Sequence, residues 1–127
     1  MLPLLAVAAA SCHRASTAGG LRETGAARSV VVRIVATPEG CPPKPGRVAA
    51  GRVEVDVENL DAETVSEIEI RTPDLSHLLG EKENLIEGLS ASFAVVLVKG
   101  RYIVNCPGAF RPRWPLVAIA SRTAGPR

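Results

Sequence analysis

A strict alternation between valine and an acidic residue runs through the middle of this 127-residue chain and constrains its fold more than any other feature. The valines are Val53, Val55 and Val57, and the acids that follow them are Glu54, Asp56 and Glu58. A period of two places the valines on one face of an extended strand and the acids on the other. One face therefore belongs in a core and the other in water, which predicts a half-buried β-strand.

Further short apolar runs follow at intervals near ten residues and are separated by Pro, Gly, Asn and Asp. The runs lie at residues 30–35, 53–58, 67–70, 93–97, 102–106 and 116–121. This spacing is typical of a β-sandwich or barrel. The one candidate helix, Leu75–Asn84, follows Pro73 and is interrupted by Gly80, so at most one short turn or helix is expected. The sequence thus predicts one all-β domain of about seven strands and about one hundred residues.

The first eleven residues carry no charge and are mostly apolar, which is typical of an export signal too short to cross a membrane. Small residues directly before Cys12 resemble a bacterial lipobox, in which the cysteine is lipidated and becomes the new N-terminus. We expect a lipoprotein signal peptide at 1–11, a lipidated Cys12 with a flexible tether at 12–28, the domain at 29–121 and a disordered tail at 122–127. The alternative is an ordinary secretory signal. With either signal the mature chain works outside the cytoplasm, and with lipidation it is anchored at the extracytoplasmic face, on the cell surface or in the periplasm.

The charge of the chain is unevenly distributed. The formal net charge is only +2, which excludes an electrostatic nucleic-acid binder. Residues 39–87 nevertheless hold twelve acids and five bases, whereas residues 88–127 hold six bases and no acid. The acidic middle is read either as solvated strand faces and loops or as a carboxylate-rich surface that attracts cations.

Three cysteines are an odd number for an exported protein, and lipidation of Cys12 would remove the oddness. Cys41 and Cys106 then remain, each at the end of a predicted strand and each followed by Pro. They are either a disulfide, as expected in an oxidising compartment, or a pair of thiolate metal ligands. Spacing alone leaves both states open.

Several segments resemble a known family in order and spacing. The most specific are Glu81-Lys82-Glu83-Asn84 and Gly100-Arg101-Tyr102-Ile103-Val104-Asn105-Cys106-Pro107-Gly108, and the likeness covers about residues 29–121. The chain resembles the EfeO-type cupredoxin domain. This resemblance implies a Greek-key β-sandwich in a bacterial iron-uptake system that binds copper or iron, with an iron permease or a haem-containing peroxidase as a partner.

The resemblance also implies a ligand set. Cys41, Glu67 and Cys106 match the positions suggested to hold metal, and Glu69 is the neighbouring candidate on the same strand face. Thiolates suit copper and carboxylates suit iron, so the mixed set leaves the choice of metal open. His77 is the only imidazole of the predicted domain and would be a nitrogen ligand if its loop closed over the strand ends. Glu81 and Glu83 are read as solvated.

The chain departs from a blue-copper protein, whose site needs two His, a Cys and a weak axial Met. After Cys106 there is no His and no Met, so an ordinary blue-copper electron carrier is not expected. No nucleophile with an adjacent base is apparent, which argues against an enzyme. Two hypotheses remain: an extracytoplasmic metal-binding lipoprotein for iron or copper uptake, and a disulfide-stapled β-sandwich lipoprotein that binds a protein or envelope partner without metal.

Overall fold

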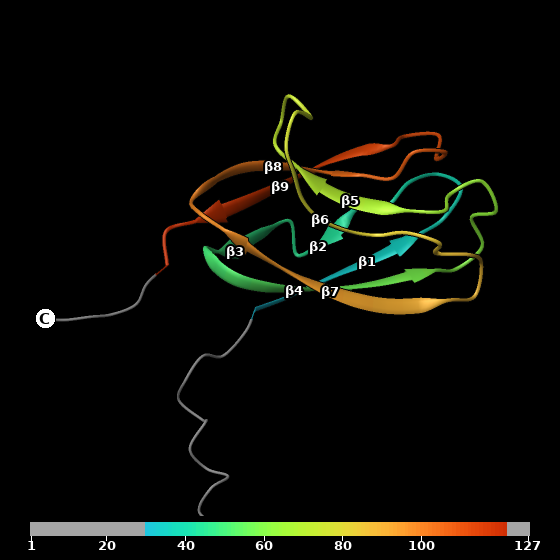
Figure 1. The fold of residues 1–127 in the computed structure, drawn as a ribbon, viewed down its shortest axis with the longest axis horizontal. Coiled ribbons are helices and arrows are strands. Elements are labelled where there is room, and N and C mark those ends of the chain that lie inside the picture. The colour runs from blue at the N-terminus through green and yellow to red at the C-terminus, as the bar shows by residue number, and fades with distance from the viewer. Residues whose placement is uncertain (1–29, 122–127) are drawn as a thin grey trace, which may run out of the picture.

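The computed structural model describes residues 30–121, which form two packed β-sheets (Figure 1). The strands are β1 (Val30–Ala36), β2 (Pro43–Lys44), β3 (Arg47–Ala49), β4 (Gly51–Asn59), β5 (Ile68–Arg71), β6 (Leu78–Lys82), β7 (Ser90–Leu97), β8 (Gly100–Asn105) and β9 (Arg113–Ile119). One sheet has the order β2-β1-β4-β7 and the other β3-β9-β8-β5-β6. The predicted all-β sandwich is confirmed, with nine strands in place of about seven.

The alternating segment forms the centre of the first sheet. β4 pairs in parallel with β1 and antiparallel with β7, so neighbours cover both of its edges. Val53, Val55 and Val57 are buried between the sheets, whereas the acids that alternate with them are partly exposed. The period of two therefore set the orientation of the strand, as expected.

The segment Leu75–Asn84, where at most one short turn or helix was expected, holds the end of a turn and then the edge strand β6, and no helix. β6 pairs antiparallel with β5, and Gly80 lies against β7 of the other sheet. A Cβ atom at Gly80 would lie 3.2 Å from ring carbons of Phe93. The glycine that suggests an interrupted helix instead permits the close approach of the two sheets.

Two further differences concern strand number and strand ends. β2 and β3 lie between the apolar runs at 30–35 and 53–58, and pair with β1 and β9 respectively. β9 begins at Arg113, three residues before the predicted closing strand, so Trp114 lies within it. Proline at position 115 is tolerated because the edge-side partner β3 pairs only with the later residues 117–119.

Four loops meet at one end of the sandwich, which we call the loop end: residues 37–42, 60–67, 83–89 and 106–112. The backbone joins them, since Leu60 N donates to Ala36 O, Asn59 N to Leu89 O and Phe110 N to Pro38 O. β1 begins and β9 finishes at the opposite end (Figure 1).

No helix in residues 30–121 is long and apolar enough to span a membrane. The predicted signal peptide, lipidated Cys12, tether and tail lie outside the described residues.

Candidate metal centre

Cys41 and Cys106 lie together at the loop end, although 65 positions separate them in the chain. Cys41 follows β1 of the first sheet after a turn over residues 37–40, and Cys106 directly follows β8 of the second. Both are fully buried and are joined by a disulfide, with their Cα atoms 6.5 Å apart. Of the two states that the sequence left open, the structure has the disulfide, and in this state neither sulfur is a thiolate ligand.

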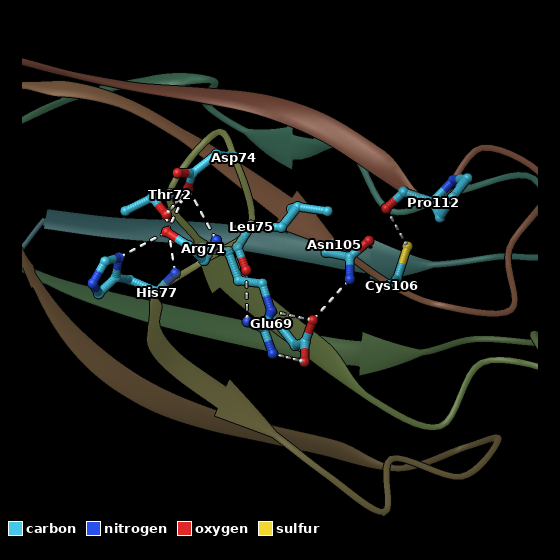
Figure 2. A network of polar contacts seen from close by, with 10 residues as sticks. Glu69, Arg71, Thr72, Asp74, Leu75, His77, Asn105, Cys106 and Pro112 are labelled. Carbon is cyan, nitrogen blue, oxygen red and sulfur yellow. Dashed lines mark hydrogen bonds and ion pairs between the residues drawn. The ribbon is translucent and has the colours of Figure 1, made fainter.

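The loop that carries Cys106 closes on itself. The backbone N–H of Cys106 donates to the Pro112 carbonyl at 2.8 Å, and Ala109 N donates to the Cys106 carbonyl at 3.2 Å. The Cys106 sulfur lies 3.6 Å from the Pro112 oxygen (Figure 2). A disulfide sulfur carries no hydrogen, so this approach is a contact, but a thiol formed on reduction would find an acceptor in place.

Three carboxylates converge on the outer face of the second sheet. Glu67 immediately precedes β5, Glu69 lies in β5 and Glu81 lies in β6, directly opposite Glu69 in the antiparallel pair. One carboxylate oxygen from each residue can be chosen so that the three atoms lie within 4.8 Å of one another. Among residues 30–121 this is the one group of at least three His, Cys, Asp or Glu side chains that meets this distance. Clustered carboxylate oxygens suit a hard cation.

Glu69 is held in place by three hydrogen bonds (Figure 2). Arg71 donates to it twice, from Nε to Oε1 at 2.8 Å and from Nη2 to Oε2 at 2.9 Å, and Asn105 Nδ2 donates to Oε1 at 2.8 Å. Only 5% of Glu69 is exposed. The Arg71 hydrogen bonds outweigh burial and, with Asn105, lower the pKa of Glu69. This carboxylate is therefore charged and fixed in orientation.

The pKa of Glu81 is shifted in the opposite direction to that of Glu69. The pKa of Glu81 is raised, first by a hydrogen bond with Glu83, then by burial, and then by the negative charges of Glu83, Glu67 and Glu69. Three carboxylates, those of Glu67, Glu69 and Glu81, thus surround one guanidinium, that of Arg71, and Glu83 adds a further negative charge beside Glu81. A bound cation would relieve the repulsion between them.

The thiolate and carboxylate halves of the predicted ligand set lie on opposite faces of the second sheet. Asn105 is paired with Glu69 and its amide reaches that carboxylate on the outer face. Cys106 is the next residue and is buried in the core, as strand alternation requires. Figure 2 shows the Asn105 amide directed to Glu69 and the Cys106 sulfur directed to Pro112. One metal ion cannot take ligands from both halves in this arrangement.

His77 is exposed and lies apart from the carboxylates, in the turn before β6. Its Nδ1 is 2.9 Å from Ser76 Oγ, and its backbone N–H donates to Thr72 Oγ1 at 3.1 Å. Asp74 organises this turn by accepting from Thr72 Oγ1, Ser76 N and Ser76 Oγ, which lowers its pKa to about 2. The polar network thus shapes a turn and does not direct the imidazole to Glu67, Glu69 or Glu81.

Three residues of the site were missed by the sequence reasoning. Glu81 was read as solvated, and Arg71 and Asn105 were given no role. Glu81 and Asn105 lie opposite Glu69 only because β5 pairs with β6 and β8, whereas Arg71 lies two residues after Glu69 in β5 itself. The alternation at 67–70 was the available signal for Arg71, which continues the Glu67 and Glu69 face.

No protein-family model and no curated protein matches the chain. Solved structures do. Auracyanin B has a TM-score of 0.58 and 16% identity, with 74% of this chain and 91% of that chain covered. Reduced auracyanin from Roseiflexus castenholzii has a TM-score of 0.55 and 12% identity, with 72% of this chain and 98% of that chain covered. Auracyanin A from Chloroflexus aurantiacus, a "blue" copper protein, has a TM-score of 0.56 and 14% identity, with 72% of this chain and 99% of that chain covered.

The ligand inventory of this chain differs from a blue-copper set despite the shared architecture. Residues 30–121 contain one histidine, His77, and no methionine, and the cysteine at the end of β8 is in a disulfide. The two-His, one-Cys and axial-Met arrangement therefore cannot be assembled from the described residues. The observed strands and the solved neighbours together show that the chain has a cupredoxin-like fold.

Proposed function

We propose that this domain is an extracytoplasmic metal-binding module of bacterial iron or copper handling, and that it binds its ion at Glu67, Glu69 and Glu81. The observation that carries the proposal is that one oxygen from each of the three carboxylates lies within 4.8 Å of the other two, on a cupredoxin-like scaffold. One solved neighbour bears on the metal, since auracyanin A is named a "blue" copper protein. The proposed role is binding and not catalysis.

The oxidation state of the cysteines decides which metal the domain prefers. With the disulfide formed, the clustered donors are carboxylate oxygens, which favour iron over soft copper. Reduction would release two thiolates at Cys41 and Cys106, which suit Cu(I). Iron at the carboxylates is therefore the first candidate in an oxidising compartment.

Glu69 would act as the fixed member of the carboxylate set. Arg71 and Asn105 hold its two oxygens, so a metal would find this ligand already oriented. Glu67 and Glu81 carry no ion pair among the described residues and supply the remaining negative charge. Arg71 opposes a cation in the same place, which limits affinity and suits a carrier that must release its ion.

The cellular role rests on the resemblance and on residues outside 30–121. A lipid on Cys12 would keep the domain at the membrane surface, and an iron permease or a haem-containing peroxidase would receive the ion. Neither the lipid nor the partner is part of the experiment that follows, which tests metal binding alone.

Calorimetric titration of the purified chain with Fe(III) citrate, Fe(II), Cu(II) and Cu(I), in the disulfide and reduced states, tests the proposal. We expect iron to bind the disulfide form and to lose at least tenfold in affinity in the Glu67→Gln/Glu81→Gln variant, because the charge around the ion falls by two. Glu54→Gln/Asp56→Asn is the matched control, since it removes two acids from the outer face of the other sheet. Equal affinity of the two double variants, or no binding in either redox state, would overturn the proposal.

A second candidate function is favoured by the disulfide itself. The buried disulfide links the two sheets covalently, as expected of a domain that is stabilised without a metal and binds a protein or envelope partner. Copper or iron would then leave the unfolding temperature unchanged. The same titrations separate the two functions.

A further inference from the structure

A cleft of about 510 Å³ opens beside the first sheet, and its lining includes neither the three clustered glutamates nor the two cysteines of the disulfide. Its walls include Arg33 and Val35 of β1, Lys44 of β2, Gly40 and Pro42 of the connecting loop, and Trp114 of β9. The volume lies within the range of small-molecule sites. Neither metal hypothesis uses any of these residues.

The aromatic wall of the cleft is rigid. The Trp114 indole Nε1–H donates to the Arg111 carbonyl at 2.7 Å, so the polar edge of the ring is already satisfied. Gly40 lies under the ring, where a Cβ atom would come within 2.7 Å of Nε1. The turn that carries Gly40 is closed by two backbone hydrogen bonds with Thr37. Trp114 therefore presents an oriented apolar surface, with Pro42 beside it.

The charged wall is a pair of cations that face each other. Arg33 and Lys44 are direct partners in the β1–β2 pair, so their side chains leave the same face of the sheet. Like charges in this position repel. Glu58 neutralises the charge of Arg33 only weakly, because the two side chains make one 3.5 Å contact and the Arg33 side chain is 61% exposed. Lys44 has no ion pair within residues 30–121. An anion between the two cations would remove the repulsion.

We propose that this cleft binds a small anion with a planar aromatic body, of the class of aromatic carboxylates. The ring would lie against Trp114 and Pro42, and the carboxylate would lie between Arg33 and Lys44. Glu39 is the one acid of the lining, so it directs the negative end of the ligand to the Arg33 and Lys44 side. The inference is independent of metal binding.

The test uses 2-naphthoate and its neutral analogue naphthalene-2-carboxamide as probes of the ¹⁵N-labelled full chain. Trp114 is the only tryptophan, so a single indole cross-peak reports on the cleft. We expect 2-naphthoate to shift this peak in a saturable manner, and the amide to bind more weakly. Equal binding of acid and amide would overturn the proposal, as would an unmoved indole peak.

Variants assign the binding to the two cations. Arg33→Gln and Lys44→Gln should each lower the affinity for 2-naphthoate by about two- to fivefold, which is the contribution of one partly exposed charge contact. Glu39→Gln should strengthen it. Arg52→Gln is the matched control, because Arg52 is an exposed arginine in β4 that does not line the cleft. Loss of affinity in the control equal to that in Arg33→Gln would show a general charge effect and contradict the assignment.

Discussion

At the scale of single residues, Asn59 does the most to hold the loop end together. It is fully buried at the end of β4, and its amide lies 2.8–3.0 Å from the carbonyl oxygens of Ala62, Val65 and Leu85. Its Oδ1 accepts from Ala62 N at 2.8 Å. One side chain thus joins the loop before β5, which carries Glu67, to the loop after β6.

Replacing Asn59 should therefore be costly. We expect Asn59→Leu to lower the free energy of unfolding by about 3 kcal/mol, because several buried backbone groups lose their partner at once. Urea denaturation measures the change. Asp61→Asn, in the exposed part of the same loop, is the control and should be neutral. A loss below about 1 kcal/mol in Asn59→Leu would mean that water or relaxed loops satisfy these groups.

The pairing of Glu69 with Arg71 makes a pH-dependent prediction. The pKa of Glu69 is lowered in the folded state, so its contribution to stability is present above its ordinary value of 4.5 and is lost as the pH falls through the folded value. Arg71→Gln should cost about 2 kcal/mol at neutral pH, because a buried carboxylate loses its main donor.

The cost of Arg71→Gln should shrink on acidification, since protonated Glu69 no longer needs the guanidinium. Unfolding free energies measured from neutral pH to below 4.5 give the profile. Arg101→Gln, an exposed arginine in the same sheet, should show no such dependence. A pH-independent cost would show that Arg71 acts through packing alone.

At the scale of elements, the sequence pattern predicted the strands that have one apolar and one polar face. It did not predict the strands whose two faces are alike. β4 was predictable because its valines and acids alternate. β6 was not, because all five of its residues are exposed or half-buried and no alternation marks them. The short strands β2 and β3 exist only through pairing with β1 and β9. Pairing between distant segments leaves no periodic signal in either of them.

The packing of β6 on β7 can be tested at Gly80. Gly80→Ala should lower stability by about 1–3 kcal/mol, because its methyl group would displace Val95 and Phe93 at a tight contact between the sheets. Thermal unfolding measures this. Gly46→Ala is the matched control, since the nearest atoms to its Cβ lie at 3.9 Å and 4.0 Å. Equal unfolding temperatures of the two variants would contradict the close approach.

At the scale of the whole molecule, the disulfide joins the two sheets and closes a loop of 65 positions. In the chain-entropy view, constraining a loop of this length stabilises the fold by about 4 kcal/mol. We expect Cys41→Ala/Cys106→Ala to lower the urea midpoint correspondingly, and reduction of the native chain to do the same. A thiol count before and after denaturation establishes the starting state. An unchanged midpoint would mean that the core alone holds the sheets together.

The candidate site shows what a sequence can and cannot specify at this scale. The proximity of Cys41 and Cys106 and the shared face of Glu67 and Glu69 were both foreseeable from the resemblance and from strand alternation. Their separation onto opposite sides of the second sheet was not foreseen. It depends on the register that places Asn105, and not Cys106, beside Glu69.

The directions of the first and last strands have a consequence for presentation. β1 starts and β9 finishes at the end of the sandwich opposite the disulfide, with the seven residues of β1 spanning roughly 20 Å between the two ends. An anchor attached before Val30 would hold the domain by its base. The disulfide, Glu67 and the metal ion proposed to bind there would then lie at the end of the domain that points away from the anchor. That end would be the one exposed to free ions and to neighbouring proteins.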